Sequence, residues 1–322
     1  LNLPMPTMRK VMNHLHRGTA AGPYADSTDA WRDLATYKQR LPGTATFHSP
    51  YHDTLHALLQ LILTNQVPPP IHPLLSANYT VAFYKDPRDP TRLRPIGVGT
   101  ALRRIVGSCV MEIFRKEIVA HLLPLGQMGI ATQGGLQFIL HSIQSQIDRY
   151  IDCPHPTRAI LLLDLANFFN ETSREACEHE IATHPTLAPV LPYFRLIYQN
   201  PNRCWIRKPD HTWTHLTQEE GFAQGCPLGP LFSALSLAPV LRHLATFLGN
   251  RATARLDRGH PGDDGRGSSA ATQSCIDDTS AALPCEDLLP LLQEIARIGP
   301  AYGIVNALPK NYILTSTTGS TP

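Results

Sequence analysis

The segment Ala159–Leu165, with the sequence AILLLDL, constrains the fold most, because it is a continuous apolar run of strand length that ends in one acid. Such a run is typical of a strand that is buried on both faces of a sheet. A buried carboxylate is costly unless it is paired or bound to a metal ion. Asp164 is therefore either a cap at the end of the strand or a metal ligand, and its partners must come from elsewhere in the chain.

Two acidic pairs lie further along the chain and differ in their surroundings. The pair Asp277-Asp278 sits in SCIDDTSAAL between runs of apolar or small residues, which predicts a hairpin whose tight turn presents both carboxylates. Two like charges so close repel each other, and a Mg²⁺ ion is the usual reason to tolerate them. The pair Asp263-Asp264 has glycine on both sides and no apolar strand next to it, so we predict a solvated surface loop there.

The composition fits a globular protein with one large or two modest domains. The 322 residues carry a formal net charge of only +2, so the overall charge does not indicate a nucleic-acid-binding protein. Seven cysteines are scattered without a CxxC pair, which is typical of reduced thiols in an intracellular protein. His52 and His56 lack a nearby cysteine or a HExxH glutamate, so we favour helix-face histidines over a zinc site.

The sequence also bears on location. No apolar run approaches about 18–20 residues, the length of a membrane span, and the N-terminus has no signal-peptide pattern. We therefore expect an intracellular protein, in the nucleus or the cytoplasm, that is neither secreted nor associated with a membrane. The chain begins at Leu1 and not at methionine, so we expect it to be a piece of a longer polypeptide.

Hydrophobic periodicity and turn residues predict alternating helices and strands. Residues 1–48 are rich in Pro, Gly, Thr and His, and we interpret them as an extension or linker with one helix over 29–40. Residues 249–270 are almost without apolar side chains, which predicts a surface loop. The expected helices are 51–66, 101–123, 133–150, 175–181, 230–248 and 286–298, and the expected strands besides 159–165 are 78–84, 93–98, 204–206, 212–216 and 312–315.

Five motifs follow one another in an order that matches a known family. They are Leu93–Ile96 (LRPI), Asp164–Asn170 (DLANFFN), Gln224–Phe232 (QGCPLGPLF), Cys275–Asp278 (CIDD) and Gly303–Asn306 (GIVN) with Lys310. From about Ala82 to Leu314 the chain resembles the fingers and palm of a reverse transcriptase, and it is most similar to those of non-LTR retrotransposons. Any one motif would be weak, but their shared order and rough spacing make the resemblance specific.

The resemblance implies an α+β fold with the right-hand architecture of polymerases, in which helices back a small antiparallel palm sheet and the thumb is absent. It divides the chain beyond the N-terminal extension into fingers (49–135), a first part of the palm (136–182), a fingers-like insertion (183–219) and a second part of the palm (220–322).

The resemblance also implies a two-Mg²⁺ site, in which Mn²⁺ can substitute. Asp164 and Asp277 would be the main ligands, the Leu165 carbonyl would lie beside Asp164, and Asp278 would be a secondary acid. Lys310 could protonate the leaving pyrophosphate as a general acid, or it is an exposed lysine before a strand.

The nucleotide would be held by residues on both sides of the site. Lys85 and Arg94 would neutralise the triphosphate, unless they are only solvated charges in a turn. Gln224 and Gly225 would lie against the incoming nucleotide and the template, since glycine lets the backbone approach closely. Phe169, five residues past Asp164, would leave no room for a 2′-hydroxyl and so select dNTPs; a core phenylalanine is the alternative.

Two residues depart from the family pattern. Cys275 takes a position that is often aromatic, and Phe168 stands where a small residue is usual, so the first palm motif could be crowded. The sequence still favours an RNA-directed DNA polymerase, a nucleotidyltransferase of a retroelement that acts on a primed RNA or DNA template with dNTPs. We expect it to be part of a polyprotein that supplies a thumb and can carry an endonuclease. The alternatives are a template-dependent RNA polymerase and a decayed or co-opted fragment that binds nucleic acid without catalysis.

Overall fold

The chain forms two compact units. The computed structural model describes residues 1–43, 45, 47–150, 158–257 and 272–315. Unit 1 comprises Leu1–Arg115 and Ile181–Pro230, and unit 2 comprises Lys116–Glu180 and Leu231–Pro322. The predicted loop around Asp263-Asp264 lies outside the described residues.

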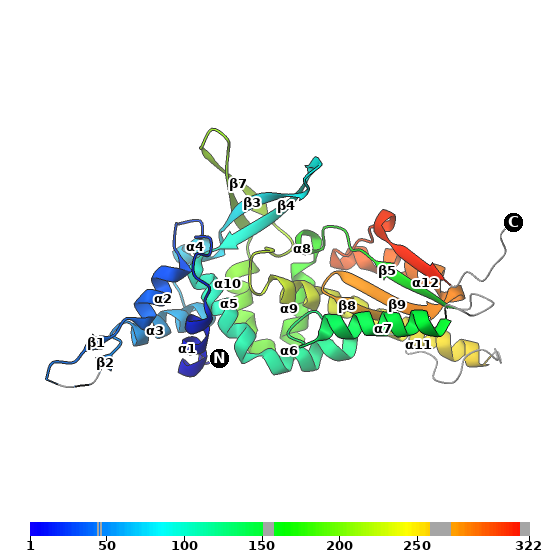
Figure 1. Ribbon diagram of the computed structural model, residues 1–322, viewed down its shortest axis with the longest axis horizontal. Coiled ribbons are helices and arrows are strands. Elements are labelled where there is room, and N and C mark those ends of the chain that lie inside the picture. The colour runs from blue at the N-terminus through cyan, green and yellow to red at the C-terminus, as the bar shows by residue number, and fades with distance from the viewer. Residues whose placement is uncertain (44, 46, 151–157, 258–271, 316–322) are drawn as a thin grey trace. The chain divides into compact units, whose positions relative to one another are not determined.

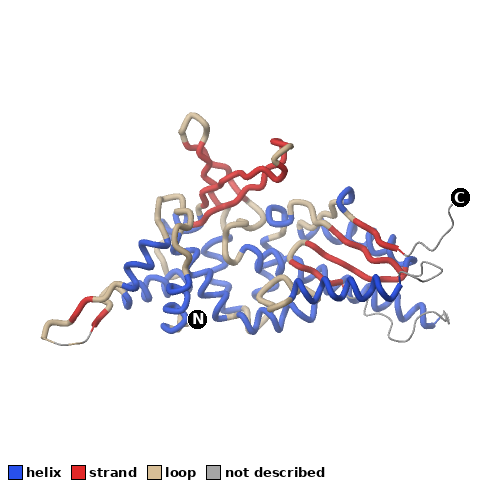
Figure 2. Tube along the Cα trace, viewed as in Figure 1, coloured by secondary structure: helices blue, strands red, loops and turns tan. Residues whose placement is uncertain are grey.

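Unit 1 contains a four-stranded sheet in the order β4-β3-β6-β7, whose strands are visible in Figure 2. Strand β3 (Asn78–Asp86) pairs antiparallel with β4 (Asp89–Gly99), and β6 (Asn202–Arg207) pairs antiparallel with β7 (Trp213–Gln218). The four strands predicted in these segments are therefore confirmed, although β4 begins earlier than expected. A parallel pairing of β3 with β6 joins the two hairpins into one sheet.

The N-terminal residues are part of the packing of unit 1. Expected as an extension or linker, they contain two helices, and the first buries Met8 and Met12 and contacts α5. The second helix is capped by Ser27, whose side chain accepts a hydrogen bond from the Ala30 N–H. The helices of this unit are α1 (Met5–His14), α2 (Thr28–Thr36), α3 (His52–Leu63), α4 (His72–Ser76), α5 (Ala101–Ile113) and α10 (Leu191–Tyr198), with short strands β1 (Gln39–Arg40) and β2 (Phe47–His48) and 3₁₀ turns η1 (Pro69–Ile71) and η3 (Ala188–Val190).

Unit 2 is built on a second four-stranded sheet, which is antiparallel throughout (Figure 1). Its order is β10 (Tyr312–Thr315), β5 (Arg158–Leu163), β9 (Asp278–Pro284) and β8 (Thr272–Cys275). Strand β5 lies between two partners, and Leu161 and Leu163 enter a core that helices α11 (Gly229–Asp257) and α12 (Cys285–Ile298) also line. Ile160, on the other face, is also buried, so the strand is covered on both sides as its sequence predicts.

The remaining elements of unit 2 are α7 (Gly135–Tyr150), α8 (Phe168–Glu171), most of α6 (Arg115–Leu122) and most of α9 (Arg174–Thr183), with 3₁₀ turns η2 (Leu123–Leu125), η4 (Gly299–Tyr302) and η5 (Leu308–Lys310). Helix α7 packs against β5 and β8, and α12 packs against β5 and β9. The predicted helix 101–123 is interrupted at Phe114, where α5 ends and α6 begins.

Helix α11 is longer than predicted, because it continues past residue 248 to Asp257. The extra turns carry Arg251 and Arg255, and both arginines bond the carboxylate of Asp287 in α12, which gives the polar end of the helix a partner. By length and composition alone, Gly229–Arg255 could cross a membrane, but 67% of its most apolar window is buried within the protein. That burial is typical of a core helix.

A buried carboxylate links three helices of unit 2. Glu180 of α9 is 4% exposed, and it contacts His121 Nε2 of α6 at 2.8 Å and Arg242 of α11 at 2.5 Å. Burial alone would raise the pKa of Glu180, but the hydrogen bonds from His121 and Arg242 outweigh it and lower the pKa. The ionised form is therefore favoured in the native state.

This cluster predicts a loss of stability in acid. Because the native pKa of Glu180 is lowered, its contribution is fully present above the unfolded value of about 4.3 and is lost as the pH falls through the native value. We expect Glu180→Gln to lower Tm near neutral pH, and the difference from wild type to shrink as the pH falls below about 4. Thermal unfolding at a series of pH values tests this, with the exposed Glu175→Gln as control; a difference that is independent of pH would contradict it.

Candidate active site

The end of β5 and the β8–β9 turn lie at the same edge of the unit 2 sheet. Leu163, the last residue of β5, pairs with Thr279 of β9 in antiparallel register. One step further, Asp164 and Asp278 therefore come opposite each other. Asp277 precedes Asp278 in the turn, since Cys275 pairs with Asp278 across it. The fold thus brings the three predicted carboxylates, which are distant in the sequence, to one edge.

The turn that carries Asp277 has an unusual backbone. Ile276, its first central residue, has φ of 63°. This left-handed region is rare for β-branched residues and costs about 1–3 kcal/mol, so it persists only where the surroundings enforce it. The side chain of Gln127 hydrogen-bonds both the N–H and the carbonyl of Ile276. Gln127 belongs to none of the five motifs, so the sequence did not single it out.

The segment 303–311 encloses Asp164. Lys310 Nζ donates to Asp164 Oδ2 at 2.8 Å, so the structure brings together these two residues of different motifs. The backbone of Asp164 is held as well, because its N–H donates to Asn311 Oδ1 at 3.1 Å and its carbonyl accepts from the Ala307 N–H at 2.8 Å. Asn311 is a second residue that the sequence did not single out, and it fixes the strand end rather than the carboxylate.

The carbonyl of Leu165 points away from this segment. In the bridge between Leu165 and Asn306, the bonds to the 303–311 segment are made by the carbonyl of Asp164 and the N–H of Ala166. Backbone groups alternate in direction along an extended strand, so those of Leu165 face the opposite side, where β9 pairs with β5. This direction suits the predicted use of the Leu165 carbonyl as a ligand.

The donor set matches the oxygen ligands that Mg²⁺ prefers. Asp164, Asp277 and Asp278 offer carboxylates, and Leu165 offers a carbonyl at the same edge. In the described part of the chain no group of three or more His, Cys, Asp or Glu side chains lies close enough to hold a metal ion. The oxygen donors fit the ion by their chemistry, although their side chains do not converge on one metal-binding group, and the Lys310 ammonium contacts Asp164.

The two departures from the family pattern have a structural outcome. Burial first, and then the negative charges of Asp278 and Asp277, raises the pKa of Cys275, so its thiol stays protonated and adds no charge to the turn. Phe168 is 3% exposed and belongs to the unit 2 core, so its bulk is taken up by packing inside the unit. Phe169 is half-buried and packs against the same core, with its ring edge-on to Phe168 at 5.8 Å between centroids.

Unit 1 carries the other predicted nucleotide-binding residues. Arg94 of β4 lies opposite Phe83 of β3, and Lys85 lies beside an irregularity in the same pairing. Both cations are exposed. The β3–β4 hairpin thus presents positive charge to solvent, as a surface that meets phosphate requires.

The backbone of Gly225 lies close to another part of the protein, the backbone of Gly97, whereas the sequence predicted a close approach to the nucleotide and the template. A Cβ at this position would lie 2.3 Å from the carbonyl oxygen of Gly97 in β4, so a larger residue would push the loop off the strand. Two consecutive turns shape the loop, through the hydrogen bonds Cys226 N–H to Ala223 and Gly229 N–H to Cys226. Gln224 is half-buried in the first turn. The loop is thereby seated on the strand that carries Arg94.

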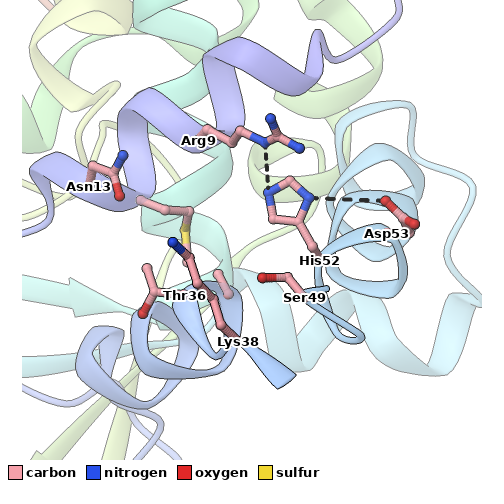
Figure 3. Close-up of a pocket in the computed structure, with 9 residues that line it drawn as sticks. Arg9, Asn13, Thr36, Lys38, Ser49, His52 and Asp53 are labelled. Carbon is pink, nitrogen blue, oxygen red and sulfur yellow. Dashed lines mark hydrogen bonds and ion pairs between the residues drawn. The ribbon is translucent and has the colours of Figure 1, made fainter. Parts of the chain in front are cut away.

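A separate polar cavity of about 790 Å³ lies in unit 1 (Figure 3). Arg9, Asn13, Lys38 and other residues line it, and none of them is a predicted site residue. Arg9 Nε donates to His52 Nε2 at 3.3 Å, and burial followed by the charge of Arg9 lowers the pKa of His52, which keeps the ring a neutral acceptor. His52, the first residue of α3, therefore links that helix to Arg9 of α1 by a hydrogen bond, in keeping with the expected helix-face histidine.

Comparison with known proteins gives a likeness in structure alone. No protein-family model and no curated protein matches the sequence. Apo telomerase from Candida tropicalis, truncated from its C-terminal domain, is 12% identical over 83% of this chain and 56% of that one, with a TM-score of 0.52. The apo enzyme from the same organism is 12% identical over 90% and 54%, with a TM-score of 0.50. Telomerase from Candida albicans, solved with a fragment of telomeric RNA, is 12% identical over 90% and 52%, with a TM-score of 0.49.

The chain spans about half the length of the solved structures it matches. Telomerase is a reverse transcriptase, so the two Candida tropicalis structures show that this chain has a reverse-transcriptase-like fold of mixed α and β structure. At 12% identity the likeness extends to the fold and no further.

Proposed function

We propose that this chain is the fingers and palm of a retroelement reverse transcriptase, most like those of non-LTR retrotransposons. It would extend a primer 3′-OH with dNTPs as an RNA-directed DNA polymerase. The observation that carries the proposal is the edge of the unit 2 sheet, where Asp164 at the end of β5 meets the Asp277-Asp278 turn within a reverse-transcriptase-like fold. We further propose an intracellular location, and a longer polyprotein as its context.

Asp164, Asp277 and the Leu165 carbonyl would hold Mg²⁺ in this proposal, with Asp278 as a secondary acid and Mn²⁺ as a substitute. Two bound ions would activate the primer hydroxyl and stabilise the charge of the leaving pyrophosphate. The protein's own contribution is to fix these oxygens in place. The Ala307 and Asn311 bonds hold the backbone of Asp164, and the hairpin register holds that of Asp278.

Lys310 would supply a proton. Its ammonium lies 2.8 Å from Asp164 Oδ2 and is partly exposed, so Nζ is open to a ligand that enters from solvent. Donation from Nζ to the leaving oxygen is general acid catalysis. In unit 1, the exposed Arg94 and Lys85 would contact the triphosphate, and the loop of Gln224 and Gly225 would support the nucleotide and the template strand.

The test of the proposal is primer extension on an RNA template with Mg²⁺, with dNTPs and rNTPs compared, in the longest reading frame that contains this chain. Extension with dNTPs supports it. A preference for rNTPs would instead indicate a template-dependent RNA polymerase. Binding of primed template without extension by either nucleotide would indicate a co-opted nucleic-acid-binding protein.

Phe169 provides a sharper prediction about sugar selection. Its half-buried ring follows Asp164 within the same motif, and a bulky ring beneath the sugar excludes a 2′-hydroxyl. We expect Phe169→Val to lower the preference for dNTPs over rNTPs by about 100-fold, since removal of steric bulk from a pocket changes discrimination on this scale. The control is Phe138→Val, at a position on α7 that is 56% exposed. An unchanged kcat/KM ratio for the two nucleotides would show that Phe169 is only a packing residue.

A further inference from the structure

Gln127 is the centre of a set of hydrogen bonds around the turn that carries Asp277. The residue is fully buried. Its Nε2 donates to the Ile276 carbonyl at 3.0 Å, and its Oε1 accepts from the Ile276 N–H at 2.9 Å. The same Oε1 also accepts from the Gly129 N–H at 3.1 Å. One side-chain amide therefore satisfies both backbone groups of a single turn residue.

The main chain beside Gln127 continues this contact. The Met128 N–H donates to the Ser274 carbonyl at 2.7 Å, and the Ser274 N–H donates to the Gly126 carbonyl at 2.8 Å. Residues 126–129, called the clasp below, thereby run parallel to β8, which is the last strand of the sheet. The clasp holds β8 along its outer side and the turn at its tip.

Both ends of the clasp require glycine. A Cβ at Gly129 would lie 2.7 Å from the Ile276 nitrogen, and a Cβ at Gly126 would lie 2.0 Å from the Thr272 carbonyl oxygen. Side chains at these positions would force the clasp away from the hairpin. The sequence GQMG thus combines one buried amide with two close backbone approaches to the same hairpin.

The clasp explains how Ile276 keeps a left-handed backbone. A hairpin turn of this kind normally uses glycine at a position with positive φ, and isoleucine there is strained. Hydrogen bonds to both backbone groups of Ile276 fix its orientation. Asp277 is the next residue, so the direction in which its side chain leaves the turn depends on the peptide that Gln127 holds.

We propose that Gln127 is a positioning residue for Asp277: by clamping Ile276, it aims the Asp277 carboxylate for metal binding. The inference rests on the proposed function, because it takes Asp277 as a ligand of the catalytic Mg²⁺. Partners that orient a metal ligand typically change metal affinity or activity by about 10–100-fold when they are removed.

The test replaces the amide with an apolar side chain of similar length. In Gln127→Met, we expect amide exchange in the 274–280 peptide to quicken, and Mn²⁺, used as a paramagnetic probe, to bind about 10–100-fold more weakly. The kcat of primer extension falls by the same factor, while KM for the dNTP stays as in the wild type. Gln293→Met is the control, because Gln293 is exposed on α12.

A second variant disturbs the turn while it leaves the Gln127 side chain in place. Gly129→Ala pushes a methyl group against the Ile276 nitrogen and should weaken Mn²⁺ binding in the same way, so the test survives if Gln127→Met fails to fold. Gly249→Ala is its control, since a Cβ on that helical glycine meets no atom within 4 Å. Wild-type Mn²⁺ affinity in folded Gln127→Met or Gly129→Ala, with only Tm lowered, would overturn the proposal and leave the clasp a stabilising element.

The outcomes for the two proposals are separable. The wild type could bind Mn²⁺ through Asp277, as judged against Asp277→Asn, and yet extend no primer. The proposed function then fails, and the Mn²⁺ affinity of Gln127→Met relative to the wild type still tests the positioning role of Gln127. If the wild type extends a primer and Gln127→Met does so at the same rate, the positioning role fails and the proposed function stands. A wild type that neither binds Mn²⁺ nor extends a primer overturns both.

Discussion

Asp277→Asn is expected to reduce the kcat of primer extension by at least about 10³-fold. A catalytic metal ion is worth several kcal/mol of transition-state stabilisation, and each 1.36 kcal/mol corresponds to a tenfold change in rate. Asparagine has the shape of aspartate but lacks its charge, so the turn is kept while the carboxylate ligand is lost. Steady-state extension with saturating dNTP and a titration of Mg²⁺ measures the effect, and a higher Mg²⁺ concentration should recover only part of the rate.

Two further variants serve as comparisons for Asp277→Asn. Asp278→Asn should reduce the kcat of primer extension less, because Asp278 is the exposed residue of the pair and has the secondary role in the predicted site. Asp210→Asn makes the same change in another hairpin turn, where Asp210 accepts hydrogen bonds from Thr212, and it should leave the rate unchanged. Equal activity of wild type and Asp277→Asn, with both proteins folded, would remove Asp277 from the site and with it the main support for a polymerase.

The strands of both sheets could be predicted because their signals are local. The apolar run of β5, the β3–β4 hairpin and the β6–β7 hairpin each follow from side-chain pattern and turn residues within a short window. The parallel pairing of β3 with β6 is different, since it joins segments separated by much of the chain. No pattern within either strand specifies that partner.

Helix ends and the N-terminal packing show where local patterns fail. The segment after residue 248 has the composition of a loop, yet α11 continues because Arg251 and Arg255 bond the distant Asp287. The first residues likewise look like a linker, but Met8 and Met12 are buried in unit 1. In both cases a tertiary contact outweighs the local preference.

The same distinction applies within the candidate site. Asp164, Asp277 and Lys310 could be predicted because their side chains belong to motifs, and the structure places Lys310 on Asp164 and the acidic turn at the same sheet edge. The role of Gln127 could not be predicted, because its partners are the backbone N–H and carbonyl of Ile276. Every residue type has these groups, so no sequence pattern identifies them as partners. The left-handed φ of Ile276 was equally hidden, since glycine would be expected there.

The second large effect is expected at Asp287, whose replacement by alanine should lower the stability of unit 2 by about 3–5 kcal/mol. Asp287 is fully buried in the first turn of α12, where it accepts hydrogen bonds from Arg251 and Arg255. Arg255 is itself 5% exposed, so removal of the carboxylate leaves a guanidinium charge buried without its main partner. Glu286→Ala is the matched control, because Glu286 is the exposed neighbour and lies 3.6 Å from Arg255.

The two units can be followed separately in this experiment. Trp31, Trp205 and Trp213 all lie in unit 1, so tryptophan fluorescence reports on that unit. Cys177 is fully buried in unit 2, and burial raises the pKa of its thiol, so reaction with a thiol reagent requires unit 2 to open. In urea, Asp287→Ala should shift the labelling of Cys177 to much lower denaturant. Replacing both buried members of the cluster, as Asp287→Leu with Arg255→Met, should recover most of the loss, because the charge that remains, on Arg251, is 34% exposed and can be solvated. A double variant as unstable as Asp287→Ala would show that the cost comes from packing and not from the buried charge.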